Sequence, residues 1–274
     1  QGVHLVLDMK FLQSDYAIMV PKTSDGRVLF AVPWHDKVVV GTTDIQRPVA
    51  ESEPKPLDEE IDFILSTAGL YMSPAPTRKD IVSVFAGQRP LAAPKKEGKS
   101  SKEVSRSHKI IVSDHDLITI TGGKWTSYRR MAEDTVDKAI EMGKIEKRKC
   151  ATRKLKVHGW RPNPNLADHM YVYGSDEPLI RDMIKQNPAL GEKLSEKYDY
   201  TVAEVLWAVR KEMAFTVEDV LARRVRLLFV DAREAQKAAP RVAQILAEEL
   251  GRDQAWIDEQ VASFTELASH YYVA

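Results

Sequence analysis

The feature that most constrains the fold is a single change in hydrophobic periodicity along the chain. Up to about Thr121 the apolar residues form short runs with the length and β-branched content of strands. Beyond about residue 150 they recur at the 3.6-residue spacing of amphipathic helices. Strands followed by helices predict an α+β fold. We place one domain at residues 1–150 and an all-α domain at residues 151–274.

The first domain is expected to form a sheet that contains a hairpin. Asp25-Gly26 separates two apolar runs, and glycine accepts positive φ without a steric cost. A helix over residues 57–71 has acids in its first turn, which suits the helix dipole. A second helix is expected over residues 126–142. The strand-like runs cover residues 3–7, 16–20, 27–33, 37–41, 80–86 and 117–121.

The second domain is expected to consist of helices. Thr216-Val-Glu-Asp219 is close to a capping box, with Asp in place of Glu, and so predicts a helix start. Pro240 suits the first position of another helix. The helical patterns cover residues 176–184, 202–213, 216–229, 240–250 and 253–271.

Composition excludes several classes of protein. The 40 Lys and Arg residues balance 40 Asp and Glu residues, so no overall positive charge favours nucleic acid. Cys150 is the only cysteine, which excludes an internal disulfide and a multi-thiol metal site and indicates a reducing compartment. The histidines show no metal-ligand spacing, so no metal site is predicted. No run approaches the roughly 18 apolar residues of a membrane-spanning helix.

Two segments depart from this neutral balance. Residues 78–109 carry nine Lys or Arg residues against three acids, and either form a solvated face or attract a phosphate. The segment lacks the interleaved aromatic residues of a single-strand binder, which argues against nucleic acid. Residues 144–161 form a basic linker, which is either solvated or docks to an anionic membrane surface.

The sharpest local chemistry lies at Gly122-Gly123-Lys124, between a strand and a helix. Consecutive glycines allow another molecule to approach the backbone, and the start of a helix favours an anionic ligand. The P-loop spacing is absent, and no GxGxxG occurs in the chain. The element is therefore either a ligand site or only a tight connection.

Three single residues also have two interpretations each. Arg89 and Arg106 lie on either side of the lysines of residues 95–102, and a guanidinium there either binds phosphate or carboxylate or pairs with a nearby acid. His4 lies in an apolar strand, where a histidine is either a hydrogen-bonded core residue or a functional group.

Several motifs, in their order along the chain, resemble the FAD-dependent glycerol-3-phosphate dehydrogenases of the aerobic, quinone-linked type. The helical half adds Arg210-Lys-Glu-Met-Ala214 and the segment from Thr216 to Ala232. The resemblance covers nearly the whole chain. In the strand-rich half the motifs are Val39-Val-Gly-Thr-Thr-Asp44, Gly87-Gln-Arg-Pro-Leu91 and Ile120-Thr-Gly-Gly-Lys-Trp-Thr-Ser-Tyr-Arg129.

The resemblance implies a flavoprotein that oxidises sn-glycerol 3-phosphate to dihydroxyacetone phosphate. Hydride would pass to FAD and electrons then to a quinone. It also implies a cytoplasmic enzyme that is peripheral to the inner face of the cell membrane, does not bind nucleic acid and allows a homodimer. The implied fold is an antiparallel substrate-binding sheet with the terminal strand–turn–helix of a flavin domain, followed by the all-α domain.

The resemblance also assigns roles to individual residues. His4 matches a histidine beside substrate and flavin and is a candidate base or a group that positions the hydroxyl. Arg89 and Arg106 match arginines at the substrate site, and Lys124 matches a lysine near flavin and substrate. The predicted catalytic residues are therefore His4, Arg89 and Lys124, and the substrate-binding residues are His4, Arg89 and Arg106. The predicted cofactor-binding residues are Gly122, Gly123, Lys124, Trp125 and Thr126.

One departure from the family bears on activity. The dinucleotide-binding GxGxxG is missing, so we expect a C-terminal part of a longer enzyme that lacks the site for the ADP half of FAD and is inactive alone. Two alternatives stay open. One is a glycerol-3-phosphate oxidase that passes electrons to oxygen. The other treats residues 151–274 as a helical module that docks to a membrane or to another protein.

Overall fold

The computed structural model of the chain describes residues 1–21, 23–24, 26–89 and 107–273. It divides into two compact units. Unit 1 consists of Gln1–Ile45, Glu51–Gly87 and Gly159–Ala274, and unit 2 of Gln46–Ala50 and Gln88–His158. The predicted domain boundary near residue 150 stays a prediction.

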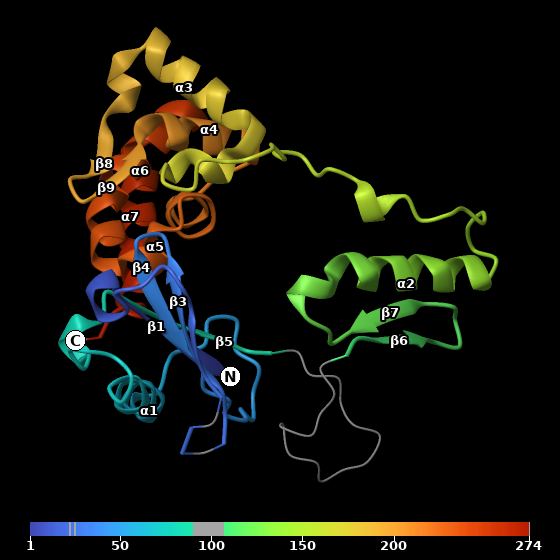
Figure 1. Cartoon of the computed structure of the whole chain (residues 1–274). Helices are drawn as coiled ribbons and strands as arrows, with labels where there is room; N and C mark the ends of the chain where they lie inside the picture. Colours follow the sequence, from blue (N-terminus) through green and yellow to red (C-terminus); the bar gives the residue numbers. More distant parts are fainter. Residues whose placement is uncertain (22, 25, 90–106, 274) are drawn as a thin grey trace. The chain divides into compact units, whose positions relative to one another are not determined.

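Unit 1 contains a five-stranded antiparallel sheet whose order is β2-β3-β4-β1-β5. The expected hairpin is confirmed, because Ile18 pairs with Ala31, although Asp25 of its turn lies outside the described residues. β1 lies between β4 and β5, so both of its edges are paired. The strands are β1 (Gly2–Asp8), β2 (Ile18–Val20), β3 (Leu29–Trp34), β4 (Lys37–Gly41) and β5 (Ser83–Gly87) (Figure 1).

Alternate residues of β1 are buried in a core shared with helix α1 (Asp58–Ala68). Val3, Leu5 and Leu7 point to one face, as the period of two in a strand requires, and are fully buried with Ile64. The edge strand β5 is held to the helical part of the same unit by Ser83, whose hydroxyl donates to the Leu228 carbonyl at 2.9 Å.

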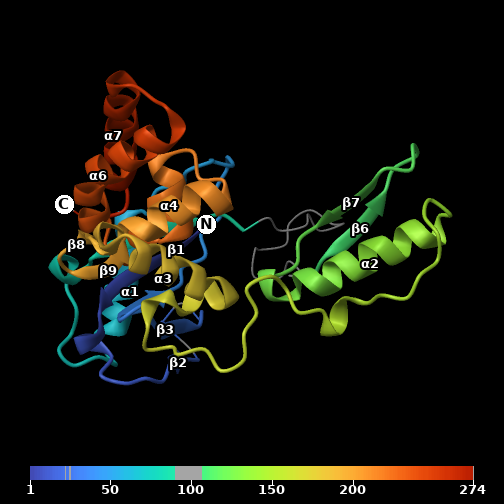
Figure 2. The ribbon, with the colours of Figure 1, turned by 90° about the horizontal axis from the view of Figure 1, so that it is seen from above.

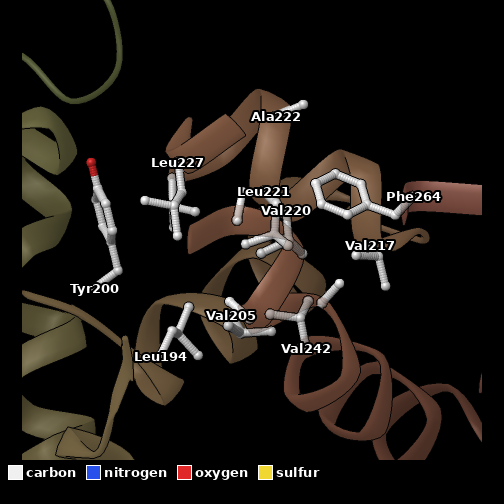
Figure 3. Packing of buried hydrophobic residues seen from close by; sticks show 14 of the residues in the cluster. Leu194, Tyr200, Val205, Val217, Val220, Leu221, Ala222, Leu227, Val242 and Phe264 are labelled. Atoms are coloured by element: carbon white, nitrogen blue, oxygen red, sulfur yellow. The ribbon is translucent and has the colours of Figure 1, made fainter. Parts of the chain in front are cut away.

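The rest of unit 1 is mostly helical. Its core forms where α6 and α7 pack together as a hairpin against α4 (Figure 2). Val205 of α4, Val242 of α6 and Phe264 of α7 point into one buried cluster (Figure 3). The helices are α3 (Glu177–Gln186), α4 (Val202–Glu212), α5 (Leu227–Val230), α6 (Ala232–Leu250) and α7 (Gln254–Ser269), and a small hairpin pairs β8 (Lys193–Ser195) with β9 (Tyr198–Thr201).

Two helical predictions change in the structure. The capping box is confirmed, since the Thr216 hydroxyl accepts from Asp219 N at 3.0 Å and the Asp219 carboxylate accepts from Thr216 N at 3.1 Å. The helix expected over residues 216–229 is nevertheless broken, because Arg226 has φ 60°. The prediction that a helix begins at Pro240 is wrong. α6 begins eight residues earlier, where Asp231 caps it by accepting from Glu234 N at 3.1 Å.

The described residues of unit 2 include a hairpin and a long helix. β6 (Lys109–Val112), which is not among the strands expected from the sequence, pairs with β7 (Ile118–Thr121). A short turn of helix leads from β7 into α2 (Tyr128–Glu141). Among the described residues of unit 2 the only buried side chain is that of Glu133, so this unit has no apolar core of its own.

The predicted fold class is confirmed: a small antiparallel sheet is followed by a helical C-terminal part. In the part of the chain that the structure describes, no helix combines the length and the apolar character needed to cross a membrane.

Candidate functional site

The first predicted site residue, His4, lies in the middle of β1, between two neighbouring strands. It pairs with Gly41 of β4 and with Phe85 of β5. Its ring stacks on Phe85 with 5.3 Å between the ring centroids. A Cβ at Gly41 would lie 2.4 Å from Cδ2 of His4, so only glycine leaves room for the ring. His4 is half-buried on the face of β1 opposite Val3 and Leu5. The imidazole is therefore held in one orientation.

Thr43, the second threonine of the motif Gly41-Thr-Thr-Asp44, has a structural role. Thr43 is buried; its hydroxyl accepts from Val3 N at 2.9 Å and donates to the Glu60 carboxylate at 2.5 Å. Glu60 is 1% exposed and also accepts from Leu57 N at 3.1 Å, at the start of α1. These bonds tie the end of β4 to α1 beside the strand that carries His4.

Sequence reasoning did not identify Glu60. It lies among the acids of the first turn of a helix, where a carboxylate is ordinarily solvated and stabilises the helix dipole. The available signal was the Glu three residues after the helix cap, a position from which it can reach back to the backbone N–H of the cap. Its burial depends on contacts far away in the sequence.

The arginines of the predicted substrate site are only partly described. Arg89 follows β5 by two residues and is half-buried in unit 2. Its neighbour Gln88 donates from Nε2 to the Val49 carbonyl at 3.3 Å, which ties this segment to residues 46–50 of the same unit. Arg106 lies outside the described residues, as do all positions from 90 to 106. The substrate roles of both arginines stay predictions.

The Gly122-Gly123 turn connects β7 to the helical segment that follows, as the sequence predicts. Both glycines have positive φ, 75° and 83°, in the region that side chains disfavour. A Cβ at Gly123 would also lie 2.6 Å from Sδ of Met131, in α2. Met131 could move to make room, so the positive φ is the reason that glycine is favoured at position 123, whether or not a ligand approaches it.

The residues after this turn face solvent. Lys124 and Thr126 are exposed, and Trp125 is 86% exposed and stacks on Tyr128 at 5.6 Å. The first N–H groups of a helix have no acceptor within it, and its positive dipole end favours negative charge. Together with the Lys124 ammonium group, these N–H groups form a surface that can hold an anionic or electron-rich ligand.

The helix behind this surface is anchored by charge. The Glu133 carboxylate of α2 forms ion pairs with Arg129 at 2.9 Å, Arg130 at 3.3 Å and Arg153 at 3.3 Å. The hydrogen bond from Arg129, together with the charges of Arg129 and Arg153, lowers the pKa of Glu133, so the carboxylate stays ionised. The network fixes the segment after α2 against the helix.

His4 belongs to unit 1, whereas Arg89 and the segment from Gly122 to Thr126 belong to unit 2. The catalytic and cofactor-binding roles assigned to these residues stay predictions. Among the residues that the structure describes, no group of three or more His, Cys, Asp or Glu side chains is placed to hold a metal ion.

Known proteins resemble this chain over most of its length. Residues 116–257 match the family model of the C-terminal domain of alpha-glycerophosphate oxidase. A mitochondrial glycerol-3-phosphate dehydrogenase of Arabidopsis thaliana is 36% identical over 279 residues, which cover 90% of this chain and 44% of that protein. The mitochondrial enzyme of Saccharomyces cerevisiae is 32% identical over 312 residues, covering 96% of this chain and 48% of its own length.

A solved structure agrees with the sequence comparisons. The glycerol-3-phosphate dehydrogenase of Bacillus halodurans, complexed with FAD, superposes with a TM-score of 0.79 at 26% identity. The match covers 98% of this chain and 56% of that one. The chain thus spans less than half the length of the curated relatives described above. The resemblance predicted from the sequence motifs is confirmed, and the chain belongs to the glycerol-3-phosphate oxidase and dehydrogenase family that carries the C-terminal domain of alpha-glycerophosphate oxidase.

Proposed function

We propose that this chain is part of a flavoenzyme that oxidises sn-glycerol 3-phosphate to dihydroxyacetone phosphate. The observation that carries the proposal is the extent of the match. Relatives with the name glycerol-3-phosphate dehydrogenase align with at least 90% of the chain, and a homologue complexed with FAD covers 98% of it.

The segment from Gly122 to Thr126 fits a flavin. The two glycines expose the backbone, and helix N–H groups next to Lys124 suit a ring system that gains negative charge on reduction. Bound FAD would supply the hydride acceptor. In this proposal Gly122, Gly123, Trp125 and Thr126 hold the cofactor through their backbone, and Lys124 stabilises the added charge.

In this proposal His4, Arg89 and Arg106 orient the substrate, and His4 is the candidate for its deprotonation. His4 takes or positions the proton of the C2 hydroxyl, and its ring lies in the space that Gly41 leaves and stacks on Phe85. Arg89 binds the phosphate through its planar guanidinium group. The family resemblance gives Arg106 the same role.

Substitution in the enzyme that contains this chain tests these roles. His4→Ala and Arg89→Ala should each lower kcat/KM by about a hundredfold or more, because they remove a proton-transfer group and a charged clamp. Arg89→Lys should recover only part of the loss, since the ammonium cannot bind bidentately. Arg252→Ala, at an exposed position between α6 and α7, is the matched control. Near-wild-type kinetics for either site variant would remove that residue from the mechanism.

We also propose that these 274 residues do not turn over alone. The sequence contains no GxGxxG, and its relatives are about twice as long. The purified chain should therefore be colourless and should give no turnover of glycerol 3-phosphate with added FAD. A yellow chain with stoichiometric FAD would contradict this proposal.

A quinone is the proposed electron acceptor, which places the enzyme on the inner face of the cell membrane as a peripheral protein. The basic linker at 144–161 supports contact with an anionic surface. Co-sedimentation with anionic liposomes that is lost in about 0.5 M salt would be expected, because salt screens such contacts. Liposomes that sediment without the protein would contradict membrane binding.

Oxygen is the alternative acceptor, because the matching family model describes the domain of an oxidase. The two acceptors differ in their product. Turnover that needs added quinone supports the dehydrogenase, whereas hydrogen peroxide formed in equal amount to dihydroxyacetone phosphate would support the oxidase.

A further inference from the structure

Unit 1 contains a cavity that none of the roles above uses. Two adjoining hollows, each of about 480 Å³, share His35, His169, Tyr171 and Tyr200 in their walls. Their size is that of sites for small organic ligands. Neither His4 nor Arg89 nor Lys124 lines them.

The break after the capped helix places Arg226 in the wall of this cavity. Arg226 has φ 60°, which is uncommon for a residue with a side chain. Its neighbours in the wall, Arg223 and Arg224, are paired: Arg223 contacts Asp219 at 3.0 Å, and Arg224 donates to the Glu212 carbonyl. Within the described part of the chain, no acceptor receives a hydrogen bond from the Arg226 guanidinium.

The two acids of the hollow that Arg226 lines, Glu204 and Glu212, already have partners. The Glu204 carboxylate is 1% exposed and accepts from His169 Nε2 and from the Tyr173 hydroxyl, each at 3.1 Å. Burial raises the pKa of Glu212, and the Arg224 guanidinium at 3.9 Å opposes that rise. In the hollow that contains Arg226, the charge left over is therefore the positive charge of Arg226. Asp15, Asp36 and Asp199 line only the adjoining hollow.

Three further side-chain donors line the cavity, and within the described part of the chain none of them makes a side-chain hydrogen bond: the imidazole of His35 and the hydroxyls of Tyr171 and Tyr200. His35 lies in the two-residue turn between β3 and β4, and its ring stacks on Tyr171 at 6.3 Å. The Tyr200 hydroxyl points away from the apolar cluster (Figure 3). Burial and the charge of Arg226 lower the pKa of His35, although Asp36 opposes this. The ring is therefore neutral near pH 7 and can donate one N–H.

We propose that this cavity binds the phosphate group of a small phosphate ester, with Arg226 and His35 as its principal donors. The guanidinium fork, the imidazole and the two phenols offer more donors than the two oxygens of a carboxylate can accept, whereas a phosphate has three terminal oxygens. The faces of Tyr171 and Tyr200 provide an apolar wall for the rest of the ligand.

The test is a titration of the 274-residue chain with inorganic phosphate at constant ionic strength. The imidazole NMR signals of His35 monitor the titration. The signals should shift saturably, and the pKa of His35 should rise, because a bound anion stabilises the imidazolium. The titratable and charged groups that surround His35 are Arg226, Asp36 and His169. The chloride form of the same buffer is the reference.

Matched variants show which residues are responsible for the shift of the His35 signals. Arg226→Gln should weaken phosphate binding by about tenfold or more, since a charge-assisted pair is lost. Arg252→Gln, which removes an exposed arginine between α6 and α7, should not change it, and Arg89→Gln should leave the shift of His35 intact. If Arg226→Gln does not fold, His35→Gln is followed instead through the side-chain signals of Tyr171 and Tyr200, and should weaken binding. Shifts that do not saturate, or that are equal in Arg226→Gln and the parent chain, would overturn the proposal.

Discussion

The ring of His4 occupies the space that a side chain at Gly41 would need. In Gly41→Ala the new Cβ would lie 2.4 Å from Cδ2 of His4, so the ring must move or the strands must separate. We expect the free energy of unfolding to fall by about 1 to 3 kcal/mol, as for other overpacked sites. Urea denaturation measures this loss, and the imidazole signals of His4 report the displaced ring.

The matched control is Gly87→Ala on the neighbouring strand β5, because a Cβ there meets no atom within 4 Å. Gly87→Ala should raise the free energy of unfolding by at most about 1 kcal/mol, because alanine restricts the unfolded chain. The double variant Gly41→Ala with His4→Ala should recover part of the loss, because it removes the clash. Equal costs for the two glycine variants would show that the clash is not the cause.

His169 makes stability depend on pH. Burial alone would lower its pKa, but the hydrogen bond and charge of Glu204 outweigh burial, so the pKa is raised. A histidine with a raised pKa contributes stability that is full below about pH 6.5, the unfolded value, and is lost as pH rises through the folded value. The cost of His169→Gln in unfolding free energy should therefore be larger at about pH 5.5 than at about pH 8.5.

His35 contributes to the pH dependence of stability with the opposite sign. The difference in unfolding free energy between His169→Gln and the parent chain is therefore needed to separate the two residues. Its pKa is lowered, and the stability linked to it is present above about pH 6.5 and is lost as the pH falls. The pH dependence of the parent chain therefore contains two opposing contributions. A cost of His169→Gln that does not change with pH would contradict the pairing with Glu204.

At the scale of residues, the sequence was informative where geometry is local. A Gly122-Gly123 turn between a strand and a helix was expected, and both glycines have a positive φ, which glycine accepts without a steric cost. The space that Gly41 leaves for His4 was not expected, because the two residues are brought together by strand pairing over 37 positions. The same holds for Glu60, whose burial depends on the distant Thr43.

At the scale of elements, Pro240 gives the clearest case of a misleading signal. It lies at an exposed position inside α6, where a proline lacks the N–H for the helical bond and its ring crowds the preceding turn. Pro240→Ala should therefore raise the free energy of unfolding by about 1 to 3 kcal/mol. Thermal and urea unfolding of the variant measure the gain.

The control for this variant is a substitution at Pro188, the first position of a short helical turn, where the missing N–H has no helical partner. Pro188→Ala should be neutral or slightly destabilising, because alanine frees the unfolded chain. A loss of stability in Pro240→Ala would contradict this prediction and mean that the proline at this position supports the packing of α6.

Element prediction succeeded where the signal lies within one turn of the chain. The Thr216–Asp219 box needs only its own residues and formed as expected. The break at Arg226 has no comparable local signal, because the segment after it packs on β5 through Leu228. The start of α6 did have a local signal, Asp231 with a Glu three residues later, but the prediction was made from Pro240. β6 was missed because it is only four residues long and half-exposed.

At the scale of the whole molecule, the two units differ in how they are stabilised. Unit 1 has three clusters of buried apolar side chains. In the described residues of unit 2 the apolar side chains remain partly exposed, and a hollow of about 440 Å³ lies along α2 beside Val136, Ile140 and Ile145. Periodicity revealed the helix of unit 2 but could not reveal this difference, because it does not say what packs on an apolar face.

This difference predicts unequal amide exchange. Hydrogen exchange is slowed by burial of apolar surface around the backbone hydrogen bonds, and unit 2 has no buried apolar side chain among its described residues. Amides of α2 and of the β6–β7 hairpin should therefore exchange at least about a hundredfold faster than those of α6 and β1 when followed by mass spectrometry. α6 is the matched comparison for α2, since both are long helices, but ten residues of α6 are buried against one of α2. Equal protection of the two helices would mean that the charge network at Glu133 stabilises unit 2 as well as an apolar core does.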